Sequence, residues 1–186
     1  DLAQRYPLPF QPQIEGAARQ AGLDAALVFG LIRQESRFIG DARSHVGASG
    51  LMQVMPATAR WTARRIGLDW RPEWATDREV NLRLGSAYLR LVLDDFGRSW
   101  PMALSAYNAG PNRPRRWREG AILEPAAWAE TIPIHETRDY VKKVLANAAV
   151  YAVRLGAAPS PVLTPWLGKP VGPREPDGPE PNKELP

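Results

Sequence analysis

The stretch Asp24-Ala-Ala-Leu-Val-Phe-Gly-Leu-Ile-Arg-Gln-Glu-Ser36 predicts a helix with one apolar face. Asp24 is a favourable N-terminal cap, and we expect the helix to cover residues 25–38. Apolar side chains recur along it at spacings of three and four, as in a helix that packs on a core: Leu27, Val28, Leu31 and Ile32. Glu35 falls on the same face, one turn further along. The pattern therefore predicts a carboxyl group at the end of a buried stripe.

Glu35 is the first candidate for a catalytic group. A carboxyl group beside apolar side chains loses hydration, which raises its pKa and keeps it protonated near neutral pH. A general acid needs this property. The alternative interpretation is a Glu at a helix end that pairs with Arg33 or Arg37. Helical spacing alone leaves both interpretations open.

The rest of the chain is also helical in its pattern. Apolar residues recur at helical spacing, and the alternation typical of strands is scarce. Caps, Gly and Pro delimit the other expected helices: residues 14–21, 56–66, 78–96, 100–108 and 136–155, with shorter pieces within 112–134. We therefore expect a mainly α fold with little or no sheet.

Proline divides the chain into two parts. Of the 19 Pro among 186 residues, nine lie in the last 30. Residues 1–156 are long enough to bury a core of their own. Pro cannot continue a helix or join a central sheet, so we predict an extended or disordered tail at residues 157–186. Trp166 and Leu167 are its apolar exceptions and are candidates to hold it on the core.

Composition excludes several classes of function. The chain has no Cys, which excludes a disulfide framework and a thiolate nucleophile. No apolar run approaches the roughly 18 residues that a membrane span needs. The net charge of +4 fits a nucleic-acid partner, an acidic polymer such as a cell-wall glycan with peptide carboxylates, or an ordinary solvated surface. Because the sequence starts at Asp1 rather than Met, we expect a processed form or an excised part of a longer chain.

Several catalytic motifs are incomplete. His135-Glu136 begins like a helical zinc site, but Asp139 stands where the second His is needed. Ser49 lies in a Gly-Ala-Ser-Gly stretch without the strand-to-helix context of a nucleophile elbow or an indicated His partner. No phosphate-binding Gly loop is present. None of these stretches completes a motif for zinc, a nucleophilic Ser or a phosphate.

Two further groups of residues are candidates for a functional site. Glu136 and Tyr140 are four residues apart and share one helical face. Tyr107 and Asn108 stand at a helix end beside a tight turn, where they can stack on and hydrogen-bond to a sugar. Each group has a plain structural alternative, because Glu136 also suits a helix N-terminus and Asn108 also suits a C-terminal cap. The seven Trp are mostly expected in the core.

Four motifs occur in the order Arg33-Gln-Glu-Ser36, Gly47-Ala-Ser-Gly-Leu-Met-Gln53 with Met55-Pro56, Ala106-Tyr-Asn-Ala-Gly-Pro111, and Glu136-Thr-Arg-Asp-Tyr-Val141. In this combination the chain resembles the soluble lytic transglycosylases, which are goose-lysozyme-like enzymes that cleave peptidoglycan. The resemblance extends from about Tyr6 to Leu155. It implies a lysozyme-like, goose-type helical domain at residues 1–156.

The resemblance also implies a role for each matching residue. Glu35 is implied to be the single catalytic acid and base. The other implied roles are contacts with the substrate or with Glu35. Ser44 is implied to be a loop hydroxyl near the reacting sugar, and Gln53 and Met55 to lie in the groove. Tyr107 and Asn108 are implied to line the cleavage subsites, and Glu136 and Tyr140 to contact the saccharide and orient Glu35. With one carboxyl, the implied reaction is non-hydrolytic cleavage of the bond between N-acetylmuramic acid and N-acetylglucosamine, which leaves a 1,6-anhydro end and needs no cofactor or metal.

The implied partner is the peptidoglycan glycan strand, and no nucleic acid is expected. The implied setting is the periplasm, in a monomer whose parent protein carries a helical region before this domain. Two alternatives stay open: a lysozyme-like muramidase that hydrolyses the same bond, and a wall-binding module without activity on the same fold.

Overall fold

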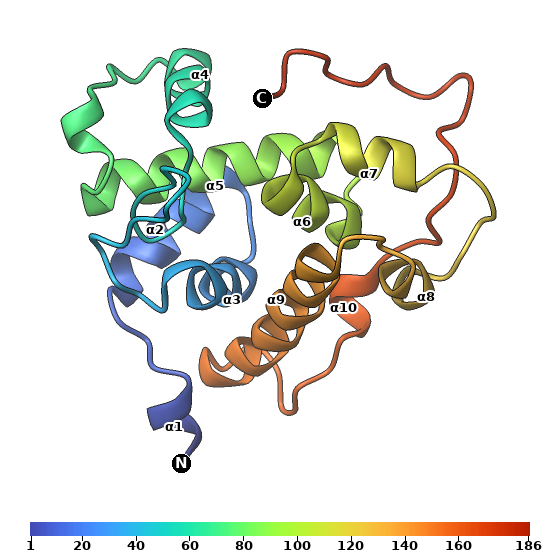
Figure 1. Ribbon diagram of the computed structural model, residues 1–186. Helices are drawn as coiled ribbons and strands as arrows, with labels where there is room; N and C mark the ends of the chain where they lie inside the picture. Colours follow the sequence, from blue (N-terminus) through green and yellow to red (C-terminus); the bar gives the residue numbers. More distant parts are fainter.

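The computed structural model describes residues 1–186, and helices dominate it throughout (Figure 1). The elements in chain order are α1 (Leu2–Arg5), α2 (Gln11–Ala21), α3 (Ala25–Ser36), α4 (Pro56–Ile66), the 3₁₀ turn η1 (Pro72–Trp74), α5 (Arg78–Asp95), α6 (Trp100–Ala109), α7 (Asn112–Trp117), α8 (Pro125–Glu130), α9 (His135–Arg154) and α10 (Thr164–Leu167). Extended pairing is limited to three isolated bridges. The predicted mainly α fold with little or no sheet is confirmed.

Helices α3 and α9 pack against each other at the centre of the molecule (Figure 1). Leu27, Leu31 and Val144 are fully buried there. Gly30 lets the two backbones approach closely, because a Cβ atom at this position would lie 2.8 Å from the backbone nitrogen of Ala148. The arrangement fixes the end of α3 relative to α9.

Helix α3 ends two residues earlier than predicted. Asp24 caps its start as expected, with its side chain accepting a hydrogen bond from the backbone of Ala26. Arg37 and Phe38 adopt left-handed backbone conformations, with φ of 51° and 66°, which end the helix at Ser36. The chain turns away at once, so Glu35 lies in the final turn of α3.

The loop between α3 and α4 is held by buried polar contacts. The Asn81 side chain of α5 accepts a hydrogen bond from Met52 N at 2.9 Å and donates one to the Ser49 carbonyl at 2.8 Å. Gly50 has a φ of 79°, and a side chain there would collide with Asn81. The Ser36 hydroxyl donates to the Leu51 carbonyl at 2.7 Å. These contacts fix the loop beside the end of α3.

The segment 157–186 runs along the surface of the helical domain in a mostly extended conformation, interrupted by α10 (Figure 1). Trp166 in α10 is buried and Leu167 is half-buried. Val171 pairs with Leu123 through two backbone hydrogen bonds of 2.7 and 2.9 Å. The elements α1, η1 and α10 are additions to the predicted helices, and each has four residues or fewer.

Gly30→Ala tests the close approach of α3 and α9. The added methyl group meets backbone atoms of α9 that cannot rotate away, so we expect a loss of about 1–3 kcal/mol in the free energy of unfolding. Denaturant unfolding followed by circular dichroism measures this loss.

Gly16→Ala in α2 is the matched control. A Cβ atom there meets nothing within 4 Å, so this substitution should stabilise the protein by about 0.5–1 kcal/mol through helix propensity. Equal effects of the two substitutions would contradict the close approach.

Candidate active site

The carboxyl group of Glu35 lies at the end of α3 and is joined to α9 by a hydrogen bond. The Tyr140 hydroxyl donates to Glu35 Oε1 at 2.7 Å, across 105 residues of sequence. The Tyr140 side chain is buried, so its hydroxyl has a fixed position. The structure thus brings together two of the predicted site residues through the packing of α3 on α9.

Burial raises the pKa of Glu35 from 4.5 to about 7. The Tyr140 hydrogen bond acts in the opposite direction, because it stabilises the carboxylate and lowers the pKa, while the negative charge of Glu136 adds to the increase. Desolvation is the dominant cause. Near neutral pH, a substantial fraction of Glu35 is therefore protonated.

Glu35 forms no ion pair with Arg33 or Arg37, the alternative considered from the sequence. Arg33 donates instead to the Arg5 carbonyl at 3.0 Å, and its guanidinium lies 4.5 Å from the centre of the Tyr6 ring. The interpretation of Glu35 as a paired surface residue is wrong.

Tyr107 and Asn108 stand in the last turn of α6, where Gly110 ends the helix. The Tyr107 hydroxyl donates to the Met52 carbonyl at 2.7 Å. Asn108 Oδ1 accepts a hydrogen bond from the Thr137 hydroxyl at 2.8 Å. Burial raises the pKa of Tyr107 well above its ordinary value, and the nearby charge of Glu35 raises this pKa further. Tyr107 is therefore a neutral donor close to Glu35.

The loop after α3 supplies Ser44, Gln53 and Met55. Gln53 Nε2 donates to the carbonyls of Ala42 and Gly50 at 3.0 and 2.8 Å, which leaves the amide oxygen as a free acceptor. The Ser44 hydroxyl oxygen accepts from the backbone of Ala48 at 3.0 Å. The Met55 side chain is exposed.

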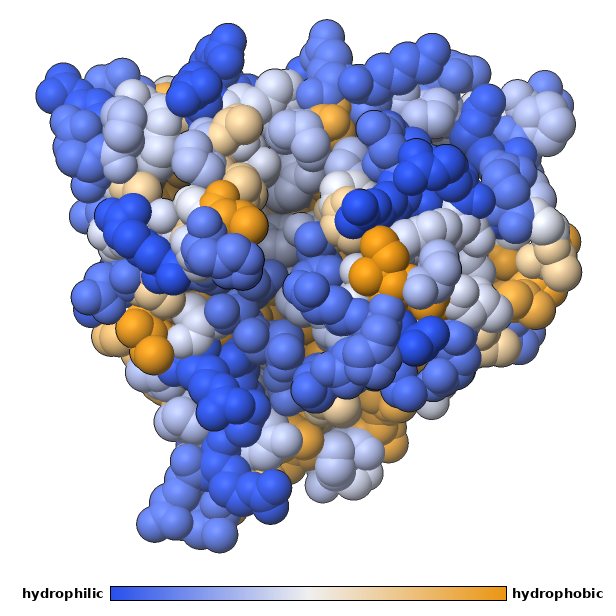
Figure 2. Space-filling model, viewed as in Figure 1, coloured by the Kyte–Doolittle hydropathy of each residue, from blue (hydrophilic) through white to orange (hydrophobic).

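Four of the predicted residues meet around one cavity of about 200 Å³: Gln53, Met55, Tyr107 and Asn108. Figure 2 shows that the face of the molecule viewed in Figure 1 is hollowed near its middle, between hydrophilic and hydrophobic residues. The cavity lining does not include Glu35, Ser44, Glu136 or Tyr140. Glu35 is connected to the cavity through Tyr107, whose pKa its charge raises. Glu136 is exposed in the first turn of α9 and acts on Glu35 through its charge.

The cavity also has walls that the sequence did not indicate. Tyr88 from the middle of α5, Thr58 from α4 and Pro186 from the tail contribute to its lining. No local pattern marks these residues, because each reaches the cavity only through the tertiary arrangement of its element. From its position in the sequence, Tyr88 is indistinguishable from an ordinary core residue of a long helix.

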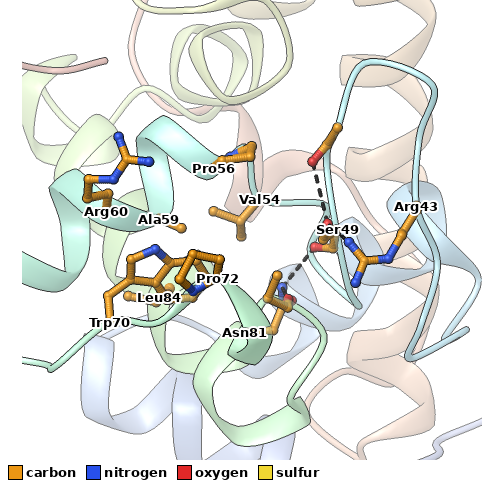
Figure 3. A pocket seen from close by; sticks show the side chains of 12 residues that line it. Arg43, Ser49, Val54, Pro56, Ala59, Arg60, Trp70, Pro72, Asn81 and Leu84 are labelled. Carbon is orange, nitrogen blue, oxygen red and sulfur yellow. Dashed lines mark hydrogen bonds between the residues drawn. The ribbon is translucent and has the colours of Figure 1, made fainter.

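A second cavity, of about 210 Å³, lies among the loop before α4, α4 itself, η1 and α5 (Figure 3). It contains none of the predicted site residues. Ser49 lies at its edge and accepts a hydrogen bond from Arg43 Nη1 at 3.2 Å, with no His partner for its hydroxyl. This cavity therefore offers no activated nucleophile.

Neither a metal-binding cluster nor a membrane-spanning helix is found among the described residues. No group of three or more His, Cys, Asp or Glu side chains is arranged to hold a metal ion. None of the helices combines the length and the apolar character needed to cross a membrane.

Comparison with known proteins places the chain in a family. The family model "Transglycosylase SLT domain" matches residues 12–123, and the model "Soluble lytic transglycosylase helical domain" matches residues 131–159. The chain is 38% identical over 159 residues to a soluble lytic murein transglycosylase of Salmonella typhimurium and 36% identical over 163 residues to that of Escherichia coli K12. These matches cover 83% and 86% of this chain but only 25% of each relative.

Solved structures agree with the sequence matches. An inactive variant of lytic transglycosylase Slt from Pseudomonas aeruginosa superposes with a TM-score of 0.86 at 39% identity, covering 92% of this chain and 28% of that one. The 70-kDa soluble lytic transglycosylase from E. coli superposes with a TM-score of 0.82 at 34% identity, covering 91% of this chain and 28% of that one. The lysozyme-like helical fold and the resemblance found in the motifs are confirmed: the chain belongs to the transglycosylase SLT domain family.

Proposed function

We propose that this chain is the catalytic part of a peptidoglycan lytic transglycosylase. It cleaves the β-1,4 bond between N-acetylmuramic acid and N-acetylglucosamine and leaves a 1,6-anhydro-N-acetylmuramic acid end. The observation that carries the proposal is the Glu35 carboxyl, whose pKa is raised to about 7 and which accepts a hydrogen bond from Tyr140. Its charge acts on Tyr107, which lines a groove of neutral polar side chains. Family membership and the names of the relatives support the same activity.

In the proposed reaction, protonated Glu35 donates its proton to the glycosidic oxygen as the bond between this oxygen and C1 of N-acetylmuramic acid breaks. The resulting Glu35 carboxylate then removes the proton of the C6 hydroxyl of the same N-acetylmuramic acid, and the C6 oxygen attacks C1. The proton is thereby returned to Glu35 and no water enters the product. Tyr140 stabilises the carboxylate between the two steps by donating its hydrogen bond.

The surroundings of Glu35 favour this route over hydrolysis with two carboxylates. A two-carboxylate glycosidase needs a second Asp or Glu that flanks the scissile bond. The groove presents Gln53, Tyr107 and Asn108 instead, all of which are uncharged. Glu136, the carboxylate that influences Glu35 through its charge, is exposed at the start of α9. The substrate's own N-acetyl carbonyl is then the group available to stabilise the cationic centre.

We also propose the bacterial periplasm as the setting and peptidoglycan strands as the substrate. The relatives are named as murein transglycosylases. The net charge of +4 suits a polymer that carries peptide carboxylates. The chain spans about a quarter of the length of these relatives. We therefore propose, as part of the same hypothesis, that the whole protein has this activity.

Product mass tests the reaction type. We expect mass spectrometry of digested sacculi to show muramic acid ends one water lighter than reducing ends. Glu35→Gln should keep the fold and abolish release, because the amide cannot donate the proton. Glu124→Gln, which changes an exposed Glu without a side-chain hydrogen bond, should match the parent.

Other products would change the assignment. Reducing muramic ends would support the muramidase alternative. Release of fragments by Glu35→Gln at the parent's rate would contradict the assigned role of Glu35. Binding of sacculi without any release would support a wall-binding module.

The pH dependence of kcat/KM tests the link between Glu35 and Tyr140. Because protonated Glu35 starts the reaction, kcat/KM should decrease above pH 7 by about tenfold per pH unit. Tyr140→Phe removes a hydrogen bond that lowers the Glu35 pKa, so the decrease should begin at a higher pH. It should also reduce kcat about ten- to a hundredfold, because the intermediate carboxylate loses a donor.

Tyr6→Phe is the matched control, since the Tyr6 hydroxyl makes no hydrogen bond and the ring contacts are retained. Its pH profile should equal that of the parent. A Tyr140→Phe profile that decreases at the same pH as the parent's, or at a lower pH, would contradict the interaction.

A further inference from the structure

The last part of the tail, residues 182–186, reaches the cavity that holds the predicted groove residues. Pro186 lines this cavity together with Met55 of the loop and Tyr107 of α6. In Figure 1 the tail passes the connection between α7 and α8, runs above α7 in this view and ends near α4. The cavity therefore has a wall built from a segment beyond every family motif.

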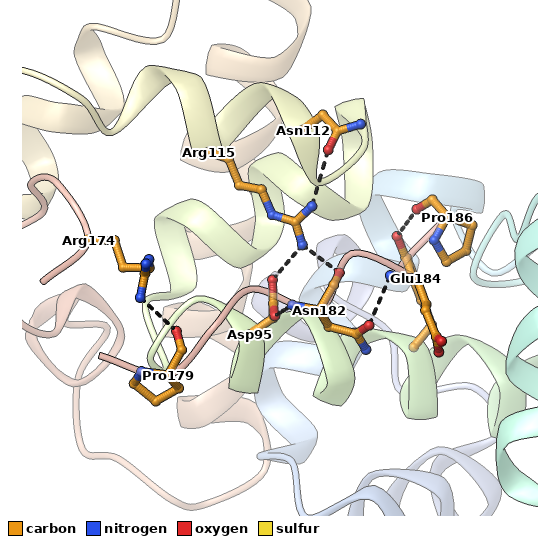
Figure 4. A network of polar contacts seen from close by, with 9 residues as sticks. Asp95, Asn112, Arg115, Arg174, Pro179, Asn182, Glu184 and Pro186 are labelled. Carbon is orange, nitrogen blue, oxygen red and sulfur yellow. Dashed lines mark hydrogen bonds and ion pairs between the residues drawn. The ribbon is translucent and has the colours of Figure 1, made fainter. Parts of the chain in front are cut away.

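A buried ion pair holds this segment at Asn182 (Figure 4). Arg115 Nη2 contacts Asp95 Oδ2 at 2.8 Å, and only 6% of the Asp95 side chain is exposed. The same Arg115 nitrogen donates to the Asn182 carbonyl at 2.8 Å, and the Asn182 backbone N–H donates to Asp95. The ion pair thus satisfies both backbone groups of one tail residue. Such paired charges, buried in a defined geometry, specify a single position for the segment.

Two further contacts fix the residues that follow. Leu185 is buried, with 7% of its surface exposed, and belongs to the main hydrophobic core. The Pro186 carbonyl accepts a hydrogen bond of 2.8 Å from the Tyr88 hydroxyl. The segment is therefore anchored by polar contacts at Asn182 and Pro186 and by an apolar contact between them.

Tyr88 connects the tail to the groove. Its ring packs against that of Tyr107, with 5.7 Å between the ring centres and an interplanar angle of 47°. Tyr107 in turn donates to the Met52 carbonyl. A continuous series of contacts thus leads from Pro186 through Tyr88 to the aromatic ring beside Glu35.

We propose that residues 182–186 form a wall of the glycan-binding groove and determine how tightly it binds the strand. This inference rests on the proposed function. Pro186 is the residue of this segment that lines the cavity, and its apolar surface and that of Met55 face the same space as the polar groups of Gln53 and Asn108. A sugar ring has the matching character, with an apolar face and hydroxyl and acetamido groups at its edge. Tyr88 acts as a positioning residue, because it holds both the segment and Tyr107.

Two substitutions test the wall. Tyr88→Phe removes the hydroxyl that binds the Pro186 carbonyl and keeps the ring against Tyr107. Leu185→Ala removes the apolar anchor. Glu180→Gln is the matched control in the same tail, since this side chain is 75% exposed and lies outside the cavity, and its ion pair with Arg174 at 3.3 Å does not involve residues 182–186.

The assay uses soluble, uncross-linked strands of alternating N-acetylglucosamine and N-acetylmuramic acid as the substrate. We expect Tyr88→Phe and Leu185→Ala to raise KM by about three- to tenfold, with kcat within about twofold of the parent. The dissociation constant for the same strands, measured in the Glu35→Gln background, should increase by the same factor. Glu180→Gln should leave all three constants unchanged.

A merely structural role would lower the melting temperature and leave KM and the dissociation constant unchanged, and that result for both variants would overturn the inference. A reduced kcat at constant KM would overturn it as well. Failure of the proposed function is distinguishable, because the parent would then bind strands without releasing fragments. The binding comparison in the Glu35→Gln background would still decide whether the segment is a wall.

Discussion

The hydrogen bond from Tyr140 to Glu35 joins the two central helices at the point where the proposed chemistry occurs. It forms because Gly30 allows α9 to approach the backbone of α3, which places residues 105 positions apart within 2.7 Å. The same packing removes water from the carboxyl group and raises its pKa to about 7. Burial and the hydrogen bond have opposite effects, so the carboxyl is protonated often enough to act as an acid and is stabilised when it becomes a carboxylate.

The positions of the remaining groove residues depend on the packing of α3 on α9. The loop after α3 is fixed by Ser36 and Asn81, and it presents the Met52 carbonyl to the hydroxyl of Tyr107. This contact places the end of α6 beside Glu35, where the groove side chains are neutral. A site with one carboxyl and several neutral donors and acceptors suits a reaction in which the substrate supplies its own nucleophile.

Helical spacing is enough to place Glu35 on the core-facing side of its helix, because its position relative to Leu31 and Ile32 is a local property. The end of α3 at Ser36 has no such signal, since Arg37 and Phe38 adopt left-handed conformations that their residue types do not favour. The partners of Glu35 and Tyr107 are also beyond local patterns. The family resemblance implied roles for Tyr140 and Tyr107. Tyr88 and Pro186, in contrast, line the groove only because of the tertiary structure. The Pro content of the tail indicates the absence of regular structure, and Trp166 is an apolar exception that is buried as expected. No local pattern indicates the later anchors at Asn182, Leu185 and Pro186.

The most direct test of the central claim is the titration of the Glu35 carboxyl by nuclear magnetic resonance, with carbon-13-labelled Glu and the signal assigned by its absence in Glu35→Gln. The packing of α3 on α9 predicts a midpoint near pH 7. A midpoint near the ordinary value of 4.5 would show that the carboxyl is hydrated and ionised at neutral pH, and would contradict its role as the acid.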